Sequence, residues 1–190
     1  MRRNFFSEEF VRVISGRARG LKLNTPSGIN TRPTLDRVKE ALFSMLLPYL
    51  DGAVVLDLFA GSGSLGIEAL SRGADKSYFI DSSNDAIECI NSNILAAKFK
   101  DCSIVIKTTA TNFLKNTSQK FDIIFIDPPY AKGLYADVLN IIAKNRLLSD
   151  EGFIIAEWDY EICFTDDLCS FEIFKEKKYG RVGITVLKWG

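Results

Sequence analysis

From residue 53 onward, short apolar runs alternate with longer segments that mix apolar and polar residues. The short runs have the length and the β-branched content of buried strands, and they fall at 53–58, 76–81, 103–107, 121–127 and 152–158. The longer segments have the apolar spacing of helices that bury one face, and they span 63–72, 84–98, 110–117 and 134–146. Strands and helices that alternate in this way are typical of a parallel α/β sheet.

The end of the chain breaks this alternation. Two apolar runs, 171–175 and 182–187, are joined by a turn at Tyr179-Gly180 that leaves no room for a helix. Strands joined by so short a connection pair antiparallel, because a parallel pair needs a crossover of about a dozen residues or more. We therefore expect an α/β fold with a seven-stranded, mostly parallel sheet that carries an antiparallel pair at one edge.

The first fifty residues follow a third pattern. Residues 11–14 and 21–23 read as two short strands on either side of an arginine-containing turn, which predicts a hairpin. A loop with proline and glycine follows, and Thr34 is then a suitable N-cap for a helix. The apolar residues of that helix share one face, at Val38, Ala41, Leu42, Met45 and Leu46. We expect a basic N-terminal extension at 1–50 and a sheet domain at 51–190.

The composition is that of a globular protein with one large domain, since the chain has 190 residues and 47% of them are hydrophobic. No apolar run approaches the roughly 20 residues that span a bilayer, and Met1-Arg2-Arg3-Asn4 lacks the apolar core of a signal peptide. We expect a soluble, cytoplasmic protein. The cysteines show no C-x-x-C spacing and the chain has no histidine, so we expect no metal site. Any catalysis must then use carboxylates, backbone groups and a cofactor.

Positive and negative charges are distributed unevenly along a chain of zero net charge. Residues 1–40 carry an excess of five positive charges, whereas residues 150–172 hold eight acids and no Lys or Arg. This asymmetry favours one face that binds a polyanion. A merely solvated surface would give the same count, so the charge does not decide the function by itself.

The first strand runs into a glycine-rich turn. Glycines at 61, 63 and 66 fit the pattern G-x-G-x-x-G, which lets a ligand approach backbone N–H groups at a helix N-terminus. This pattern does not separate a dinucleotide from S-adenosylmethionine. Asp57 favours the second ligand, because an acid at the end of this strand suits a cationic ammonium and repels a pyrophosphate.

The second strand ends in an acid, Asp81, which lies 24 residues after Asp57. A carboxylate at this place can bond to the ribose hydroxyls of an adenosine-containing ligand. It can also cap the helix that begins near residue 84, and we expect both roles to be possible. Together with the glycine turn, the two acids predict an adenosine-containing ligand.

The fourth strand ends in Asp127-Pro128-Pro129-Tyr130. Two prolines stop the strand and leave a carboxylate, carbonyl groups and an aromatic ring at its end. Acceptors beside a stacking face suit a planar group that bears an amine, such as a nucleobase. Because ligands of open parallel sheets bind at the carboxyl ends of the strands, this segment should face the turn at Gly61. The alternative is a simple strand terminator followed by a surface ring.

These motifs resemble those of known enzymes. The segments 57–70 and 127–130 resemble the cofactor and catalytic motifs of amino-group methyltransferases that use S-adenosylmethionine, and the segments 12–20 and 31–40 resemble the bacterial RsmD family. The resemblance covers the chain from about Arg12 to Trp189. It implies a Rossmann-like class I S-adenosylmethionine-dependent methyltransferase fold. It also implies methyl transfer to the N2 amine of one guanine in 16S ribosomal RNA, the guanine at position 966.

The same resemblance implies roles for individual residues. Catalysis falls to Asp127, Pro128 and Tyr130: the Asp127 carboxylate and the Pro128 carbonyl accept the amine N–H groups, and Tyr130 stacks on the base. The implied cofactor contacts are Asp57, Phe59, Ala60, Gly61, Ser62, Gly63, Asp81 and Ala110. Many relatives have an acid or amide after the third strand, where this chain has Thr108-Thr109-Ala110-Thr111, so we expect the backbone near Ala110 to contact the adenine.

The basic N-terminal extension is expected to bind RNA phosphates. The candidates are Arg12, Arg17, Arg19, Lys22, Arg32 and Arg37, with Lys39 as a further one. Arg32 and Arg37 fit equally well as ion-pair partners that hold the helix after Thr34. We expect a monomer that acts on the small ribosomal subunit or an assembly intermediate. Two alternatives stay open: a DNA adenine-N6 methyltransferase, which shares the catalytic motif, and a nucleic-acid-binding module without turnover.

Overall fold

The computed structural model describes residues 11–26, 34–128, 134–159, 168–180 and 182–190. The helices are α1 (Thr34–Leu46), α2 (Ser64–Ser71), α3 (Asn84–Ala97), α4 (Ala110–Asn116) and α5 (Leu134–Lys144), with short 3-10 helices η1 (Leu47–Tyr49) and η2 (Lys100–Cys102). The strands are β1 (Val54–Asp57), β2 (Lys76–Asp81), β3 (Ser103–Lys107), β4 (Phe121–Ile126), β5 (Leu148–Asp159), β6 (Phe171–Tyr179) and β7 (Val182–Trp189). Within these ranges, no helix is long and apolar enough to cross a membrane.

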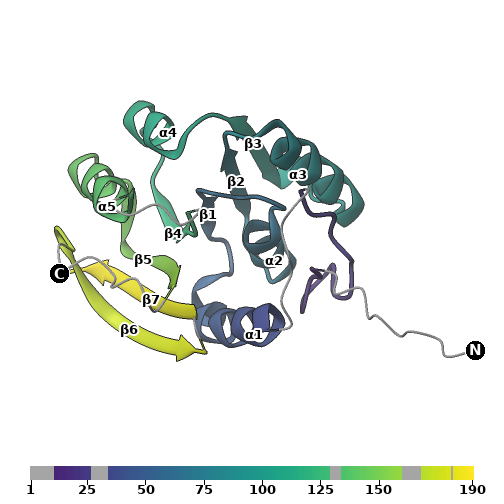
Figure 1. Ribbon diagram of the computed structural model, residues 1–190, viewed down its shortest axis with the longest axis horizontal. Coiled ribbons are helices and arrows are strands. Elements are labelled where there is room, and N and C mark those ends of the chain that lie inside the picture. Colours follow the sequence, from purple (N-terminus) through teal and green to yellow (C-terminus); the bar gives the residue numbers. More distant parts are fainter. Residues whose placement is uncertain (1–10, 27–33, 129–133, 160–167, 181) are drawn as a thin grey trace, which may run out of the picture.

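The strands form one seven-stranded sheet in the order β3-β2-β1-β4-β5-β7-β6 (Figure 1). The strands β3, β2, β1, β4 and β5 run parallel to one another, whereas β7 pairs antiparallel with both β5 and β6. The predicted fold, including the antiparallel pair at one edge, is therefore confirmed. The strand order reverses between β1 and β4, which is the place where open parallel sheets bind ligands.

Helices cover both faces of this sheet, with α1, α2 and α3 on one face and α4 and α5 on the other (Figure 1). Successive strand residues point to opposite faces, so each face has its own apolar layer. Val55 and Phe125 belong to the layer under α1 and α2, and Leu56 and Ile124 belong to the layer under α4 and α5. Burial on both faces explains why the parallel strands are continuous apolar runs in the sequence.

Helix α1 packs through the predicted stripe, since Val38, Leu42 and Leu46 are all buried. The helix begins at Thr34, so the predicted start agrees with the structure to within one residue. The apolar stripe fixes which face is buried, but it does not fix the first residue, because a threonine is also tolerated inside the first turn.

The predicted N-terminal hairpin turns back on itself but does not contain two strands. A single antiparallel bridge joins Arg12 and Lys22. The N–H groups of the turn are used elsewhere: the Arg17 N–H donates to the Ser71 carbonyl at 2.8 Å, and the Ala18 N–H donates to the Ser71 hydroxyl at 2.9 Å. The two arms nevertheless pair as predicted, since the Val13 N–H donates to the Leu21 carbonyl at 2.9 Å and the Leu23 N–H donates to the Val11 carbonyl at 2.8 Å. The predicted antiparallel hairpin pairing is therefore present, although the paired stretch is too short to form the two strands expected at 11–14 and 21–23.

Glu68 of α2 fixes this segment against the sheet domain. Its side chain is fully buried, and it accepts hydrogen bonds from the N–H groups of Ile14 at 2.7 Å and Ser15 at 3.0 Å. It also accepts one from Arg72 Nε at 2.7 Å, and Lys39 Nζ lies 3.5 Å from the same carboxylate. A buried carboxylate thus joins the N-terminal segment, α1 and α2.

Candidate active site

Three carboxylates come from the carboxyl ends of three adjacent strands, β1, β4 and β5. In the strand register, Asp57 is paired with Phe125, and Phe125 is paired with Ile155. Asp127 and Glu157 each lie two residues further along their strands, so all three acids fall on the face of the sheet that carries α1 and α2. The sheet therefore gathers them at the point where its strand order reverses.

The glycine turn lies beside the first of these acids. Gly61 and Gly63 have φ values of +53° and +76°, which glycine adopts without strain. Gly66 has a different function: a Cβ there would lie 2.3 Å from the Phe79 ring, so the glycine lets α2 approach β2 closely. The Gly66 N–H donates to Asp57 Oδ2 at 3.0 Å, which holds the acid against the first turn of α2.

Asp57 is only 3% exposed. Its burial raises the pKa of the carboxyl to about 7, and the negative charges of Asp127 and Asp81 act in the same direction. The hydrogen bond from Gly66 lowers the pKa but does not offset the burial. A cation placed next to this carboxylate would remove much of that penalty, as the ammonium of a methionine moiety would.

Asp81 holds two backbone segments at once. Its Oδ2 accepts the Gly61 N–H at 2.9 Å, and its Oδ1 accepts the Ser83 N–H at 2.9 Å, one residue before α3. The carboxylate is partly exposed and so remains open to a ligand. Asp81 therefore shapes the glycine turn and the start of α3, and the ribose contact stays a prediction.

The remaining residues predicted in this turn lie around the same opening. Ala60 is buried and its N–H donates to the Ile80 carbonyl at 3.0 Å, whereas Phe59 and Ser62 are partly exposed. The Ser62 carbonyl accepts a hydrogen bond from Asn93 Nδ2 at 2.9 Å. Ala110 is buried at the start of α4, next to the end of β3. The structure thus places these residues along the ends of β1, β2 and β3.

Asp127 follows the last residue of β4, and Pro128 is buried beside it. Asp127 is exposed at the end of the strand, and desolvation by the protein around it raises the pKa of its carboxyl above the usual range. Tyr130 lies outside the described residues.

Two residues of this site are absent from the sequence-based predictions. Burial and the charge of Asp127 raise the pKa of Glu157 to about 8. The hydroxyl of Tyr135, in α5, donates to the Glu157 carbonyl, and burial together with Asp127 raises the pKa of that phenol. Glu157 follows an apolar run, as Asp57 and Asp127 do, so this pattern could have indicated it. Nothing in the sequence indicates Tyr135.

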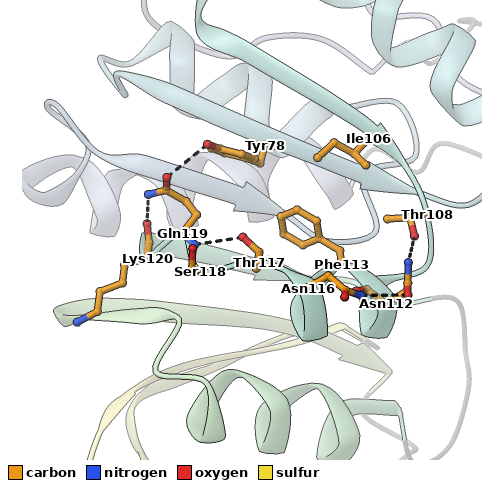
Figure 2. A pocket seen from close by; sticks show the side chains of 10 residues that line it. All are labelled: Tyr78, Ile106, Thr108, Asn112, Phe113, Asn116, Thr117, Ser118, Gln119 and Lys120. Atoms are coloured by element: carbon orange, nitrogen blue, oxygen red, sulfur yellow. Dashed lines mark hydrogen bonds between the residues drawn. The ribbon is translucent and has the colours of Figure 1, made fainter.

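A groove of about 610 Å³ lies on the opposite face of the sheet, between β2, β3 and α4 (Figure 2). Its polar side chains bond to one another: Asn112 Nδ2 donates to Thr108 Oγ1 at 2.8 Å, and the Tyr78 hydroxyl donates to Gln119 Oε1 at 3.4 Å. None of the three strand-end acids lines it. Thr108 and Asn112 of its lining are each two positions from Ala110, the predicted adenine contact.

The predicted RNA-binding residues differ in exposure and in the partners that their side chains already have. Arg12 forms an ion pair with Asp36 at 2.8 Å. Arg17 donates to the Leu70 carbonyl at 3.0 Å, and its guanidinium lies over the Phe99 ring. These two cations therefore have structural partners as well as exposed surface.

The other candidates fall into three groups. Arg19 and Arg37 are exposed, and within the described chain neither forms an ion pair. Lys22 is exposed and already has an interaction. Arg32 lies outside the described residues, and so does any ion pair that it forms.

The prediction that Lys39 binds RNA is wrong. This side chain is 7% exposed, and its Nζ bonds to the Arg12 carbonyl and to Ser64 Oγ in addition to facing Glu68. Burial lowers its pKa, and Glu68 raises it in part compensation. The sequence of the helix does not show that Lys39 pairs with a buried acid of another helix.

Comparison with protein families gives one match over nearly the whole chain. The family model described as "Conserved hypothetical protein 95" matches residues 11–188. The Bacillus subtilis (strain 168) protein YlbH is 38% identical over 181 residues, which covers 94% of this chain and 98% of that protein. The Escherichia coli (strain K12) protein named "Ribosomal RNA small subunit methyltransferase D" is 36% identical over 172 residues, which covers 90% and 86%.

Solved structures give the same picture. The Escherichia coli protein yhhF is 31% identical, covers 95% of this chain and 98% of its own, and superposes with a TM-score of 0.85. A structure of SMU.776 complexed with SAH is only 15% identical and shares the fold alone, with a TM-score of 0.68.

Proposed function

This chain belongs to the RsmD family of ribosomal RNA small subunit methyltransferases, and on that premise we propose that it methylates 16S ribosomal RNA with S-adenosylmethionine as methyl donor. The proposed target is the exocyclic N2 amine of one guanine. The observation that carries the proposal is the convergence of Asp57, Asp127 and the Gly61 turn at the reversal point of the sheet. These are the groups that hold a cation, orient an amine and admit a ligand close to the backbone.

The residues of the site fit S-adenosylmethionine. Asp57 is a buried carboxylate whose pKa is raised by burial, and the ammonium of the methionine part would stabilise its ionised form. Asp81 keeps a partly exposed carboxylate for the ribose, and the glycines at 61 and 63 leave the turn without side chains. The bound cofactor supplies an electrophilic methyl group.

Asp127 and Pro128 would orient the acceptor amine. The lone pair of the guanine amine is delocalised into the ring, which makes the nitrogen a poor nucleophile. If the Asp127 carboxylate and the Pro128 carbonyl accept its two N–H groups, the lone pair points toward the methyl group. Alignment at about 3 to 3.5 Å is the main catalytic effect, and the carboxylate also stabilises the positive charge that develops on nitrogen. Tyr130 is proposed to stack on the extruded base, a contact worth roughly 1–3 kcal/mol.

The basic N-terminal segment is proposed to hold the RNA. Arg19 and Arg37 are its most available cations, because they are exposed and the described chain gives them no ion-pair partner. Phosphate contacts of this kind position the RNA without reading its sequence. We infer a monomeric, cytoplasmic enzyme that meets its RNA within the small subunit or a precursor of it.

The function is tested by nucleoside analysis of 16S ribosomal RNA from a strain that lacks this protein. We expect the loss of one N2-methylguanosine per small subunit, restored by the wild-type gene. An unchanged N2-methylguanosine content would contradict the proposal. Transfer of labelled methyl to adenine in duplex DNA, with none to ribosomal RNA, would support the DNA methyltransferase alternative instead.

A further inference from the structure

The acids at the ends of β1, β4 and β5 form a cluster that the amine-binding role of Asp127 does not explain. The register pairs Ile126 with Ala156, so the next residues, Asp127 after the end of β4 and Glu157 of β5, lie beside each other. Neighbouring strands lie about 4.8 Å apart, which brings the two backbones close. We call Asp57, Asp127 and Glu157 the strand-end carboxylate cluster.

The charged groups next to this cluster disfavour the ionised form of its members. The negative charge of Asp127 raises the pKa of both Asp57 and Glu157. The negative charge of Asp81 also raises the pKa of Asp57. Tyr135, from α5, faces both Asp127 and Glu157. The Gly66 N–H of α2 is a dipole that relieves only Asp57. Among the described residues, the charges that act on Asp57 and Glu157 are those of other acids.

We propose that the strand-end carboxylate cluster releases a proton when the positively charged cofactor binds. Glu157 takes part in this proton exchange through the neighbouring Asp127. The proposal rests on S-adenosylmethionine as the cofactor. In the free protein, burial raises the pKa of Asp57 to about 7 and that of Glu157 to about 8. These two acids therefore hold protons that isolated carboxylates would have lost. A sulfonium placed over the cluster favours the ionised form of each acid, so its binding releases protons.

The transfer step then reverses this exchange. The amine nitrogen forms a bond to the methyl carbon, the bond from that carbon to sulfur breaks, and its electron pair stays on the sulfur, which becomes neutral. The nitrogen carries the positive charge and loses one proton to the Asp127 carboxylate. Asp127 shares this proton with Glu157. The cluster therefore gains a proton in the same step that removes the sulfonium charge, and its net charge stays balanced.

Calorimetry without RNA tests this exchange. Binding of S-adenosylmethionine and of S-adenosylhomocysteine is titrated at about pH 7.5 in buffers of different ionisation enthalpy, which gives the number of protons released per ligand. The two ligands differ in the sulfonium charge. We expect S-adenosylmethionine to release more protons, and its affinity to rise more steeply with pH between about 6 and 8. Equal proton release by the two ligands would overturn the proposal.

The Glu157→Gln variant isolates the contribution of that residue. It keeps the shape of the side chain and cannot exchange a proton, so we expect it to lose at least half of the extra protons released with S-adenosylmethionine. Glu151→Gln is the matched control, since Glu151 is exposed on the same strand at its other end. Proton release that is unchanged in Glu157→Gln, or reduced equally in both variants, would remove Glu157 from the exchange.

The wild-type comparison of the two ligands still tests the cluster if the variant does not fold. Because RNA is absent, an error in the proposed RNA substrate leaves the proton count unaffected. Failure of both ligands to bind would overturn the cofactor assignment and the proton exchange together.

Discussion

At the scale of single residues, Asp57 shows how a binding group can weaken the free protein. Burial raises its pKa from 3.8 to about 7, so the folded protein binds a proton more tightly there than the unfolded chain does. The folded state is therefore favoured at low pH, and Asp57 subtracts stability progressively as the pH rises from about 4 to about 7. The cofactor's cation would return this stability on binding.

This predicts that Asp57→Asn stabilises the cofactor-free protein at pH 8 by roughly 1–4 kcal/mol and has little effect at pH 4. The asparagine carbonyl can still accept the Gly66 N–H, so the change removes mainly the charge. Urea unfolding at the two pH values measures the difference, and cofactor affinity should fall. A variant that is less stable at pH 8 would show that the Asp57 charge supports the fold.

At the scale of elements, the strands and helices follow from the pattern of apolar residues, and the contacts between them do not. Continuous apolar runs predict β1 to β5 because these strands are buried on both faces. The two arms of the N-terminal segment pair as the sequence predicts, but the turn between them is held by Ser71 and Glu68, which are more than fifty positions away in the sequence. No local pattern marks such partners.

The same limit applies to the candidate site. Asp57, Gly61, Asp81 and Asp127 stand at strand ends in recognisable motifs, so the sequence indicates them. Glu157 belongs to the site because β5 pairs with β4, and that pairing depends on the strand order of the whole sheet. A site residue without a motif becomes visible only when the register is known.

Glu68 is the element-scale contact with the largest predicted effect. Glu68→Gln leaves Lys39 and Arg72 buried beside a neutral amide, and removal of one partner from a buried ion pair costs about 3–5 kcal/mol. Urea unfolding should show a loss of this size. The control is Glu40→Gln, because Glu40 is exposed on α1. A loss below about 1 kcal/mol would mean that the carboxylate does not hold α1 and the N-terminal segment in place.

At the scale of the whole molecule, the proposed function requires the basic segment and the ends of β1 and β4 to act on one RNA. The network around Glu68 joins them, because Lys39 reaches from α1 to Ser64 at the start of α2. The glycine turn precedes that same helix. A rigid connection of this kind would keep a phosphate held by the N-terminal segment at a fixed distance from the amine held by Asp127.

Charge reversal tests this surface. We expect Arg19→Glu combined with Arg37→Glu to weaken RNA binding and to reduce the dependence of log K on log salt by about 0.7 for each lost phosphate contact. Lys144→Glu is the control, because Lys144 is an exposed cation in the last turn of α5, which leads to the start of β5. Equal effects in the two proteins would indicate a general charge effect and not a defined RNA surface.

Methyl transfer by the purified protein tests the central claim most directly. The substrate is small ribosomal subunits from a strain that lacks the protein, the donor is methyl-labelled S-adenosylmethionine, and the product is identified by mass spectrometry of the 16S nucleosides. We predict one labelled N2-methylguanosine per subunit with the wild type, and none with Asp127→Ala, which should still bind the cofactor. Label in any other nucleoside, or full transfer by Asp127→Ala, would contradict the proposed site and reaction.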